Sequence, residues 1–472
     1  MKLFSSEERN NNKLWAIISL ALFTISSIFH LAQDSLFHIP SAVLTFMRWI
    51  VIISFLVYGF YKRTLTVWIL LSMLIGMEIG MDLPEVAKNL RFLSKIFINL
   101  IKTIIAPIII STLVIGIAGH SNMKQLGRMG WKSLLYFEIV TTIALFIGLF
   151  AINISKAGVG VTIPEGLSND LPATEPKTWQ EIIIHIFPEN IIKSIYHGDV
   201  LPIVLFSVIF GIALALVKSE KKVHVMNFME GLAETMFKFT EIIMYFAPIG
   251  VGAAMAYTVG HMGIGFIKPL FMLLATLYIA LFVFILLVFI PVALIAKIPI
   301  KQFIKAVSEP VTIAFATTSS ESALPKAFEN MEKFGVPRKV VSFVLPTGYS
   351  FNLDGTTLYL ALASVFVAQA AGIHLSFGQQ ILMVFTLMLT SKGVAGVPRA
   401  SLVILLGTAA SFNLPVWPIM AILGIDELMD MARTSVNVIG NCLASVVVAR
   451  WENEFDDAKA KSFGTKKEVV SI

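Results

Sequence analysis

Long runs of apolar residues follow one another along almost the whole chain, and short polar or basic stretches separate them. Most runs reach the roughly 20 residues that an α-helix needs to cross the hydrocarbon core of a bilayer. They lie at residues 14–32, 42–60, 65–81, 96–119, 133–154, 201–217, 235–259, 267–296, 339–371 and 416–449. The pattern predicts an all-α polytopic membrane protein. A signal peptide is the alternative for the first run, but this run lacks a convincing small-residue cleavage site.

The composition of the 472 residues supports this interpretation, since 57% are hydrophobic and only 14% are charged. Soluble domains average about half apolar and about a quarter charged residues. The net charge of +6 does not indicate a nucleic-acid partner, because the basic residues gather in short loops at 62–63, 124–132, 218–222 and 297–305. Such loops face the cytoplasm. We therefore expect a multi-pass protein of the plasma (inner) membrane, in contact with membrane lipid, with both termini cytoplasmic.

Sequence signatures of enzymes and metal clusters are missing from the chain. The single cysteine, Cys442, rules out an intramolecular disulfide. No HExxH motif, glycine-rich phosphate loop or Gly-x-Ser-x-Gly elbow is present. We therefore expect neither an enzyme nor a bound cofactor.

The C-terminal half contains a coarse internal repeat. Two tips rich in Ser, Gly and Pro, "TTSSESALP" (317–325) and "SKGVAGVPRAS" (391–401), interrupt apolar sequence, and a helix with acids and amides follows each tip. Interrupted membrane segments in corresponding positions of two repeats indicate a binding site near the middle of the bilayer. Irregular backbone is tolerated at that depth only where it is buried in protein or lines a cavity.

The last apolar helix carries a polar stripe. At 100° per residue, six polar residues fall within an arc of roughly 100°. Charges on this stripe cannot face lipid, because each would cost several kcal/mol there. A structural salt bridge between Asp430 and Arg433 is one interpretation. A site for a zwitterion or dianion is the other, in which Arg433 forms a fork for a carboxylate and Asp430 accepts from an ammonium. The stripe consists of Asp426, Asp430, Arg433, Thr434, Asn437 and Asn441.

A second polar stretch, "SFNLDGTTLY" (350–359), lies within an otherwise apolar helix. We expect Gly355 to unwind the helix locally and to free carbonyl groups near Asn352. Together with the Asp354 carboxylate, these oxygens would suit a small hard cation such as sodium, or a linked proton. A Pro/Gly kink whose backbone groups are satisfied by neighbouring helices is the structural alternative.

Four ordered motifs resemble those of the dicarboxylate/amino acid:cation symporter family, which has the glutamate-transporter fold. They are "TTSSESALP", "PTGYSFNLDGTTLY" (346–359), "SKGVAGVP" (391–398) and "DMARTSVNVIGN" (430–441). The resemblance covers roughly residues 64–452 and is greatest to bacterial proton or sodium/glutamate-aspartate symporters. It implies eight core helices with two re-entrant hairpins, a homotrimer, and transport by an elevator mechanism. The two helices before residue 64 lie outside this plan.

The resemblance also implies a division of the chain. Residues 1–63 would form the extra N-terminal membrane helices, and residues 453–472 a cytoplasmic tail. Residues 64–300 would form a scaffold, apart from two transport-domain helices at about 133–154 and 267–296. Residues 301–452 would form the transport core of hairpin, helix, hairpin and helix.

The family's substrate roles transfer to matching positions. Arg433, with Thr356 nearby, would bind the side-chain carboxylate of an acidic amino acid, and Asp430 and Thr434 its amino group. Asn437 and Ser320 would hold the α-carboxylate. The second hairpin would close over the substrate as the gate, through Gly396, Val397, Pro398, Arg399 and Ser401. A sodium-coupled member would place its cations at Gly348, Ser350, Asn352, Asp354, Asn437, Thr141 and Thr142.

Departures from the family pattern bear on coupling. Asn441 stands where sodium-coupled members have an Asp, and Glu138 and Glu321 stand where they have uncharged residues. A buried carboxylate such as Glu138, near Asp354, would have a raised pKa and could carry a proton. This favours proton coupling, with a structural acid as the other interpretation of Glu138. The retained Asn352 and Asp354 keep sodium open.

Two other functions compete with uptake of acidic amino acids. A C4-dicarboxylate symporter of the same family is the first, but its substrate has no ammonium for Asp430 to bind. A membrane sensor without transport is the second, and it would bind without accumulation. The sequence does not decide whether glutamate or aspartate is the preferred substrate. The two differ by one methylene group, which changes the binding free energy in a pocket by only about 1–3 kcal/mol.

Overall fold

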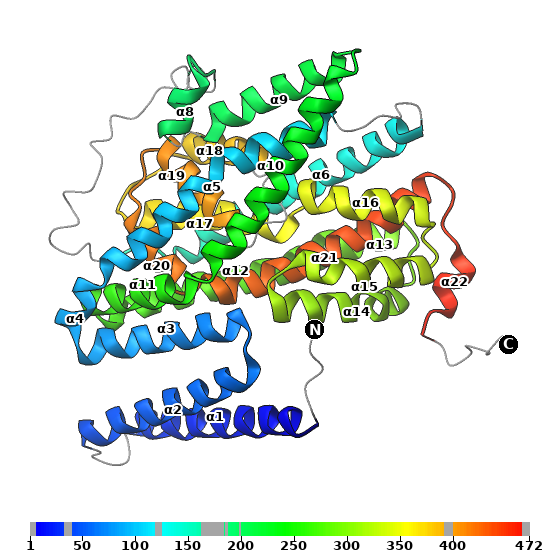
Figure 1. Cartoon of the computed structure of the whole chain (residues 1–472). Helices are drawn as coiled ribbons and strands as arrows, with labels where there is room; N and C mark the ends of the chain where they lie inside the picture. The colour runs from blue at the N-terminus through cyan, green and yellow to red at the C-terminus, as the bar shows by residue number, and fades with distance from the viewer. Residues whose placement is uncertain are drawn as a thin grey trace. The chain divides into compact units, whose positions relative to one another are not determined.

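The computed structural model describes residues 6–32, 40–118, 125–161, 184, 187–197, 200–390 and 400–464. All regular secondary structure within these ranges is helical (Figure 1). Seven helical stretches in them are long and apolar enough to cross a membrane, and α10 with α11 would make an eighth. The prediction of an all-α polytopic membrane protein is therefore confirmed.

The helices have the following bounds. The N-terminal half contains α1 (Ser6–Ala32), α2 (Ser41–Lys62), α3 (Leu65–Asp82), α4 (Pro84–Asn89), α5 (Arg91–Ala118), α6 (Gln125–Ser155), α8 (Ile191–His197), α9 (Val200–Leu216) and α10 (Lys221–Met244). The C-terminal half contains α11 (Ala247–Met262), η2 (Ile264–Phe266), α12 (Ile267–Phe284), η3 (Ile285–Phe289), α13 (Ile290–Ile295), α14 (Ile300–Thr317), α15 (Ser320–Lys333), α16 (Arg338–Phe351), α17 (Asp354–Ala370), α18 (Phe377–Thr390), α19 (Ala400–Ser411), α20 (Trp417–Leu423), α21 (Asp426–Trp451) and α22 (Asp457–Ser462).

Several apolar runs that the sequence presents as continuous are broken in the structure. The run 235–259 divides into α10 and α11, and Pro248 lies in the first turn of α11, where its missing N–H has no consequence. Within 267–296, the wide turn η3 precedes Pro291, whose ring would clash with the carbonyl group four residues earlier in a regular α-helix. The run 339–371 divides into α16 and α17. The pattern of apolar residues along the sequence does not show where such breaks in a helix occur.

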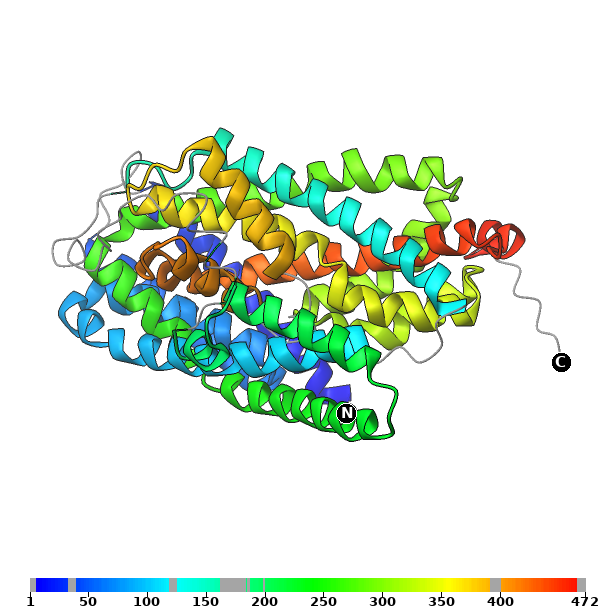
Figure 2. The same cartoon turned by 90° about the horizontal axis from the view of Figure 1, so that it is seen from above.

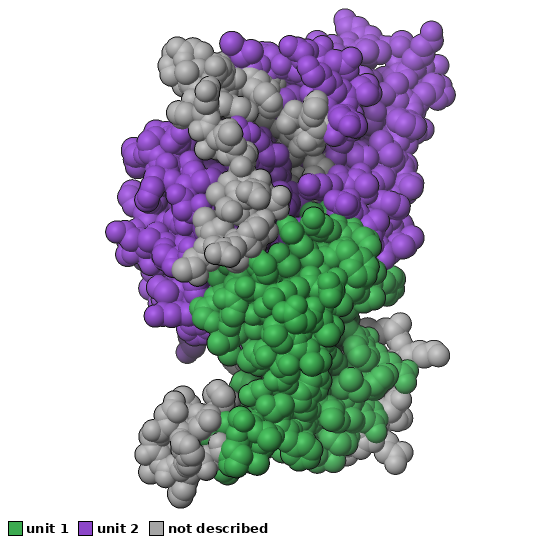
Figure 3. Space-filling view, turned by 90° about the vertical axis from the view of Figure 1, so that its left-hand side faces the viewer, with its two compact units in different colours: residues 1–98, 245–267, 423–427 green, residues 99–244, 268–422, 428–472 purple. Residues whose placement is uncertain are grey.

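The chain forms two compact units, which Figure 3 colours separately. Unit 1 comprises residues 1–98, 245–267 and 423–427, and unit 2 comprises residues 99–244, 268–422 and 428–472. Unit 1 therefore contains α1 to α4 together with α11, while unit 2 contains the candidate hairpins and most of α21. The division of the chain into a scaffold and a transport core stays a prediction.

Glycines allow α3 and α11 to pack closely in unit 1. A Cβ atom on Gly76 would collide with the carbonyl oxygen of Gly252, and one on Gly80 would come within 2.8 Å of the carbonyl oxygen of Ala256. On α11, a Cβ on Gly260 would come within 2.6 Å of the Ala87 side chain. Small residues four apart are the usual means by which membrane helices bring their backbones together. These glycines explain how two almost wholly apolar helices form a specific contact.

The core of unit 2 contains α17, which is buried from Asp354 to Ala368. Helix α6 packs along it, and its Gly148 approaches the carbonyl group of Leu358. Gly158, in the turn that follows α6, approaches the carbonyl group of Phe366. Helix α21 is also buried over most of its length. Both helices therefore hold their polar side chains away from lipid, as the polar stripe on the last helix requires.

Helices α14 and α15 form the first interrupted hairpin. The chain reverses at Thr318, which adopts a left-handed conformation (φ 51°), and Ser319 caps α15 by accepting a hydrogen bond from the Ser322 N–H at 3.2 Å. The predicted tip at 317–325 is therefore a real turn. Helices α18 and α19 flank the second predicted tip, which lies outside the described residues.

The segment after α21 packs back on unit 2 (Figure 2, red). The Asp456 N–H donates to the Gly335 carbonyl at 3.0 Å, and Arg450 makes two hydrogen bonds to Asp457 at 2.6 and 2.7 Å. The Phe334 ring lies 5.8 Å from that of Phe455. Residues 453–464, which the sequence predicts as part of a solvated tail, are thus attached to the base of the first hairpin.

Candidate functional site

The polar stretch 350–359 forms the junction between α16 and α17. Asn352 and Leu353 leave the helical conformation, with φ −121° and ψ 69° at Asn352. The Leu353 carbonyl accepts from both the N–H and the hydroxyl of Thr357, at 2.7 and 2.6 Å, which starts the new helix. The expected interruption is therefore present. It lies before Asp354 and not at Gly355.

Gly355 has a different role from the one expected. It belongs to the first turn of α17, and a Cβ atom there would collide with the backbone carbonyl of Arg433 on α21. The residue is glycine because the two helices are in backbone contact at this point. The expectation that Gly355 unwinds the helix is wrong for this reason.

Three polar side chains meet at the junction, and each is 0% exposed: Asn352, Asp354 and Asn441. The Asn352 amide donates to Asp354 Oδ2 at 3.1 Å and to Asn441 Oδ1 at 3.3 Å. Glycines make room for these side chains, since a Cβ on Gly440 would collide with Asp354 Oδ2 and one on Gly348 with Asn441 Oδ1. The cluster therefore occupies a tightly built interior position.

The oxygen chemistry of this cluster suits a cation. Asn352 Oδ1 is buried and accepts no hydrogen bond from any of the described residues. Leaving such an acceptor without a partner costs free energy. A small hard cation binds carboxylate and amide oxygens of this kind. Asn352 and Asp354, which the sequence singles out for this role, do lie together.

Asn437 joins α21 to the start of α17. Its Oδ1 accepts from the N–H groups of Gly355 and Thr356, at 2.8 and 3.2 Å, and its Nδ2 donates to the Thr356 hydroxyl at 2.9 Å. The first N–H groups of a helix have no partner within the helix, so Asn437 satisfies two of them. This capping function explains why an amide is needed here, and the sequence pattern alone did not predict it.

Asp430 and Arg433 form a charged pair on α21, and Arg433 lies one helical turn before Asn437. Arg433 is 1% exposed, and its Nε donates to Asp430 Oδ1 at 2.9 Å. The Thr434 hydroxyl donates to the same oxygen at 2.8 Å. The guanidinium also lies over the ring of Tyr359, 4.3 Å from its centroid, a cation–π contact. Sequence reasoning missed Tyr359, although it shares a face of α17 with Thr356, three residues earlier.

The remaining predicted residues lie at varied places. Ser401 is buried near the start of α19, and Ser320 is half-buried at the start of α15. The Thr141 hydroxyl donates back to the Phe137 carbonyl at 2.7 Å, and the half-buried Thr142 hydroxyl lies 4.0 Å from Met388 Sδ. Four of the predicted gate residues lie outside the described part of the chain, namely Gly396, Val397, Pro398 and Arg399. The side chain of Ser350 is also outside it.

The two candidate proton carriers are not buried in the single chain. Glu138 is exposed on α6, next to the buried Phe137, and Glu321 is exposed in the first turn of α15. The burial expected for Glu138 is therefore not found. Asp354, by contrast, is 0% exposed.

Comparisons with known proteins identify the family. The profile of the sodium:dicarboxylate symporter family matches residues 65–451. The chain is 43% identical over 405 residues to the proton/sodium-glutamate symport protein of Bacillus caldotenax, covering 84% of this chain and 96% of that protein. It is 41% identical over 407 residues to the C4-dicarboxylate transport protein of Bacillus subtilis, with coverage of 84% and 96%. It is 40% identical over 426 residues to the proton/glutamate-aspartate symporter of Escherichia coli, with coverage of 87% and 97%.

These relatives are transporters and not enzymes, and their matches extend over nearly their full length. The family match begins at residue 65 and therefore leaves α1 and α2 outside it. The buried polar junction and the charged pair on α21 both lie within the matched range. The chain belongs to the sodium:dicarboxylate symporter family and is a multi-pass membrane symporter.

Proposed function

We propose that this symporter takes up acidic amino acids, glutamate or aspartate, together with protons or sodium ions. The observation that carries the substrate class is the buried pair on α21, where Asp430 Oδ1 accepts from both Arg433 and Thr434. A guanidinium beside a carboxylate offers a complementary partner to both charges of an amino acid. The third charge of the substrate, its side-chain carboxylate, gives the specificity for acidic residues.

We assign the substrate groups as follows. The guanidinium of Arg433 presents a planar fork that matches a carboxylate, and we place the substrate's side-chain carboxylate there. The carboxylate of Asp430 accepts from the α-ammonium, assisted by the Thr434 hydroxyl. We place the α-carboxylate of the substrate beside Asn437 and Ser320.

A C4-dicarboxylate is the competing substrate, and a relative with that name is 41% identical to this chain. Overall similarity therefore does not separate the two substrates. The local chemistry does, because a dicarboxylate would bring a second negative charge next to Asp430, which is only 6% exposed. Like charges in a poorly solvated site repel strongly. Asp430 is the residue on which the amino-acid proposal depends.

We place the coupling cation at the junction of α16 and α17. Sodium coupling is supported by the buried Asn352 Oδ1 oxygen beside the Asp354 carboxylate. Proton coupling would use the same Asp354, because its carboxylate is the one group of the Asn352–Asp354–Asn441 cluster that can take up and release a proton. Helix α21 links this cation cluster to the Asp430–Arg433 pair. Its Asn437 accepts hydrogen bonds from the N–H groups of Gly355 and Thr356, next to Asp354, and its Arg433 lies one turn before Asn437.

For the transport cycle we propose a homotrimer in which a transport core built from residues 301–452 moves as an elevator. The second hairpin, with Gly396, Val397, Pro398, Arg399 and Ser401, would act as the gate. The support is the resemblance of the four ordered motifs to the glutamate-transporter fold.

Uptake into proteoliposomes tests the proposal. The purified chain would be given labelled glutamate, aspartate or succinate, with sodium and proton gradients imposed separately. We expect accumulation of glutamate or aspartate that one of the two gradients drives. Accumulation of succinate with no competition by either amino acid would contradict the substrate assignment. Binding without accumulation under any gradient would indicate a sensor.

A further inference from the structure

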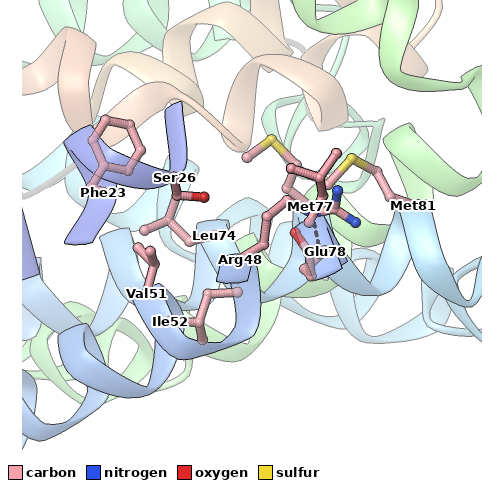
Figure 4. A pocket seen from close by; sticks show the side chains of 10 residues that line it. Phe23, Ser26, Arg48, Val51, Ile52, Leu74, Met77, Glu78 and Met81 are labelled. Atoms are coloured by element: carbon pink, nitrogen blue, oxygen red, sulfur yellow. Dashed lines mark hydrogen bonds and ion pairs between the residues drawn. The ribbon is translucent and has the colours of Figure 1, made fainter. Parts of the chain in front are cut away.

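A cavity of about 380 Å³ lies in unit 1, lined by residues of α1, α2 and α3 (Figure 4). Its volume falls within the range of about 300–1,000 Å³ that is typical of small-molecule sites. Most of its wall is apolar and includes Phe23, Val51, Ile52, Leu74, Met77 and Met81. Because α1 and α2 precede the family match at residue 65, this cavity depends on helices that the match does not include.

One end of the cavity is charged. Arg48 Nε donates to Glu78 Oε1 at 2.5 Å, and Arg48 Nη2 donates to Asp82 Oδ1 at 3.1 Å. The indole N–H of Trp49 donates to Asp82 Oδ2 at 3.0 Å. Two carboxylates therefore surround one guanidinium, which leaves a formal charge of about −1 at this end. Figure 4 shows Arg48 and Glu78 side by side among apolar side chains.

The charged end retains capacity for a ligand. Glu78 is 3% exposed, and Arg48 donates to its Oε1 and not to its Oε2. Arg48 uses Nε and Nη2 for its hydrogen bonds to Glu78, Thr45 and Asp82, and not Nη1. Both residues line the cavity. The cavity thus presents one acceptor and one donor of opposite charge beside an apolar space. This combination suits an amphiphile whose head group carries both charges.

The position of the charges along the helices agrees with a lipid. Glu78 lies one turn before the end of α3 at Asp82, whereas Leu74 lies one turn deeper. One turn is about 5.4 Å of helix, so the charges lie near the end of the membrane-spanning stretch and the apolar wall extends inward. A phospholipid has its polar and apolar parts in the same order along the bilayer normal.

We propose that this cavity binds an acyl chain of a membrane phospholipid with an ethanolamine head group. The ammonium of the head group donates to Glu78, which offsets the excess negative charge, and the phosphate accepts from Arg48. A choline head group has no N–H to donate, and a glycerol head group has no positive charge. The proposal concerns only unit 1 and does not depend on which substrate or ion the protein transports.

Native mass spectrometry of the full-length, delipidated protein tests this proposal. Dioleoyl phosphatidylethanolamine, phosphatidylcholine and phosphatidylglycerol would be added separately, so that only the head group differs. We expect the ethanolamine lipid to bind about tenfold more tightly than the glycerol lipid, as the gain of one charge-assisted hydrogen bond implies. Equal binding of the three lipids, or a preference for the glycerol lipid, would overturn the head-group assignment.

Two variants and a control locate the site. Glu78→Gln should remove the preference for the ethanolamine lipid, while Leu74→Trp should fill the cavity and reduce binding of all three lipids. Glu85→Gln removes an equivalent charge from the exposed Glu85–Lys88 pair on α4 and should change nothing. Should both Glu78→Gln and Leu74→Trp retain the ethanolamine lipid at wild-type affinity, the cavity is not its site. The wild-type comparison decides the head-group question even if one variant does not fold.

Discussion

Asn437 and Thr356 hold each other through two hydrogen bonds. Asn437 Oδ1 accepts from the backbone N–H of Thr356 at 3.2 Å, and Asn437 Nδ2 donates to the Thr356 hydroxyl at 2.9 Å. The two residues lie on different helices, α21 and α17, each of which carries groups of the candidate site. The amide thus connects the substrate pair on one helix with the cation cluster at the start of the other.

Asn437→Ala should destabilise the protein. It leaves the N–H groups of Gly355 and Thr356 and the Thr356 hydroxyl without their partner in a buried site. Each buried group without a partner costs about 1–3 kcal/mol, so we expect a loss of about 3 kcal/mol or more and a clearly lower Tm in detergent. Ser435→Ala is the control, because the Ser435 hydroxyl only donates back to Met431 on the same helix. Equal melting of the two variants would contradict the capping role.

Gly355→Ala should destabilise the contact between α17 and α21, because the new methyl group meets the backbone carbonyl of Arg433, which cannot move aside alone. Overpacking of this kind costs about 1–3 kcal/mol. Gly231→Ala, on α10, is the matched control, since a Cβ there would point into open space with no neighbouring helix within 4 Å. That change should be neutral or stabilise by up to about 1 kcal/mol. Thermal unfolding of the two purified variants measures the difference, and an unchanged Tm for Gly355→Ala would argue against close backbone contact.

Asp430→Asn should weaken the binding of amino acids far more than that of dicarboxylates. The substitution removes the charge that accepts from the α-ammonium, and loss of a charge-assisted hydrogen bond corresponds to about tenfold or more in affinity. Competition by glutamate and by succinate in the same variant measures the two effects. If both lose affinity equally, Asp430 serves only as the structural partner of Arg433.

Asp354→Asn should abolish accumulation driven by an ion gradient. The amide cannot release a proton, and it removes the only formal negative charge of the Asn352–Asp354–Asn441 cluster. Substrate binding measured without a gradient should change less than uptake. Asp457→Asn, at an exposed carboxylate on α22, serves as the control. Gradient-driven accumulation by Asp354→Asn at the wild-type rate would exclude this cluster as the coupling site.

Glu138→Gln should retain gradient-driven accumulation. The carboxylate is exposed on α6 in the single chain, so the burial on which its predicted role as a proton carrier depends is not present there. Uptake under a pH gradient in sodium-free medium, compared with exchange of internal for external substrate, is the measurement. A variant that exchanges substrate but no longer accumulates it would restore Glu138 as the proton carrier.

The sequence by itself determined the class of protein and its helical content, and it singled out the polar residues that lie within the apolar runs. Apolar runs predict membrane helices because lipid leaves the backbone no partners outside the helix. Charges such as Asp430 and Arg433 stand out in those runs because lipid cannot accommodate them. Both signals depend on residue type and spacing along the chain, so no knowledge of the fold is needed to find them.

The tertiary structure decided how those residues are used. The sequence could not show that Gly355 faces the Arg433 carbonyl, that Asn437 caps α17, or that Tyr359 lies under the guanidinium, because each of these contacts joins residues more than 70 positions apart. The exposure of Glu138 likewise depends on which face of α6 packs against α17. Helical periodicity gives the direction of a side chain relative to its own helix, whereas burial is set by the neighbour that lies opposite.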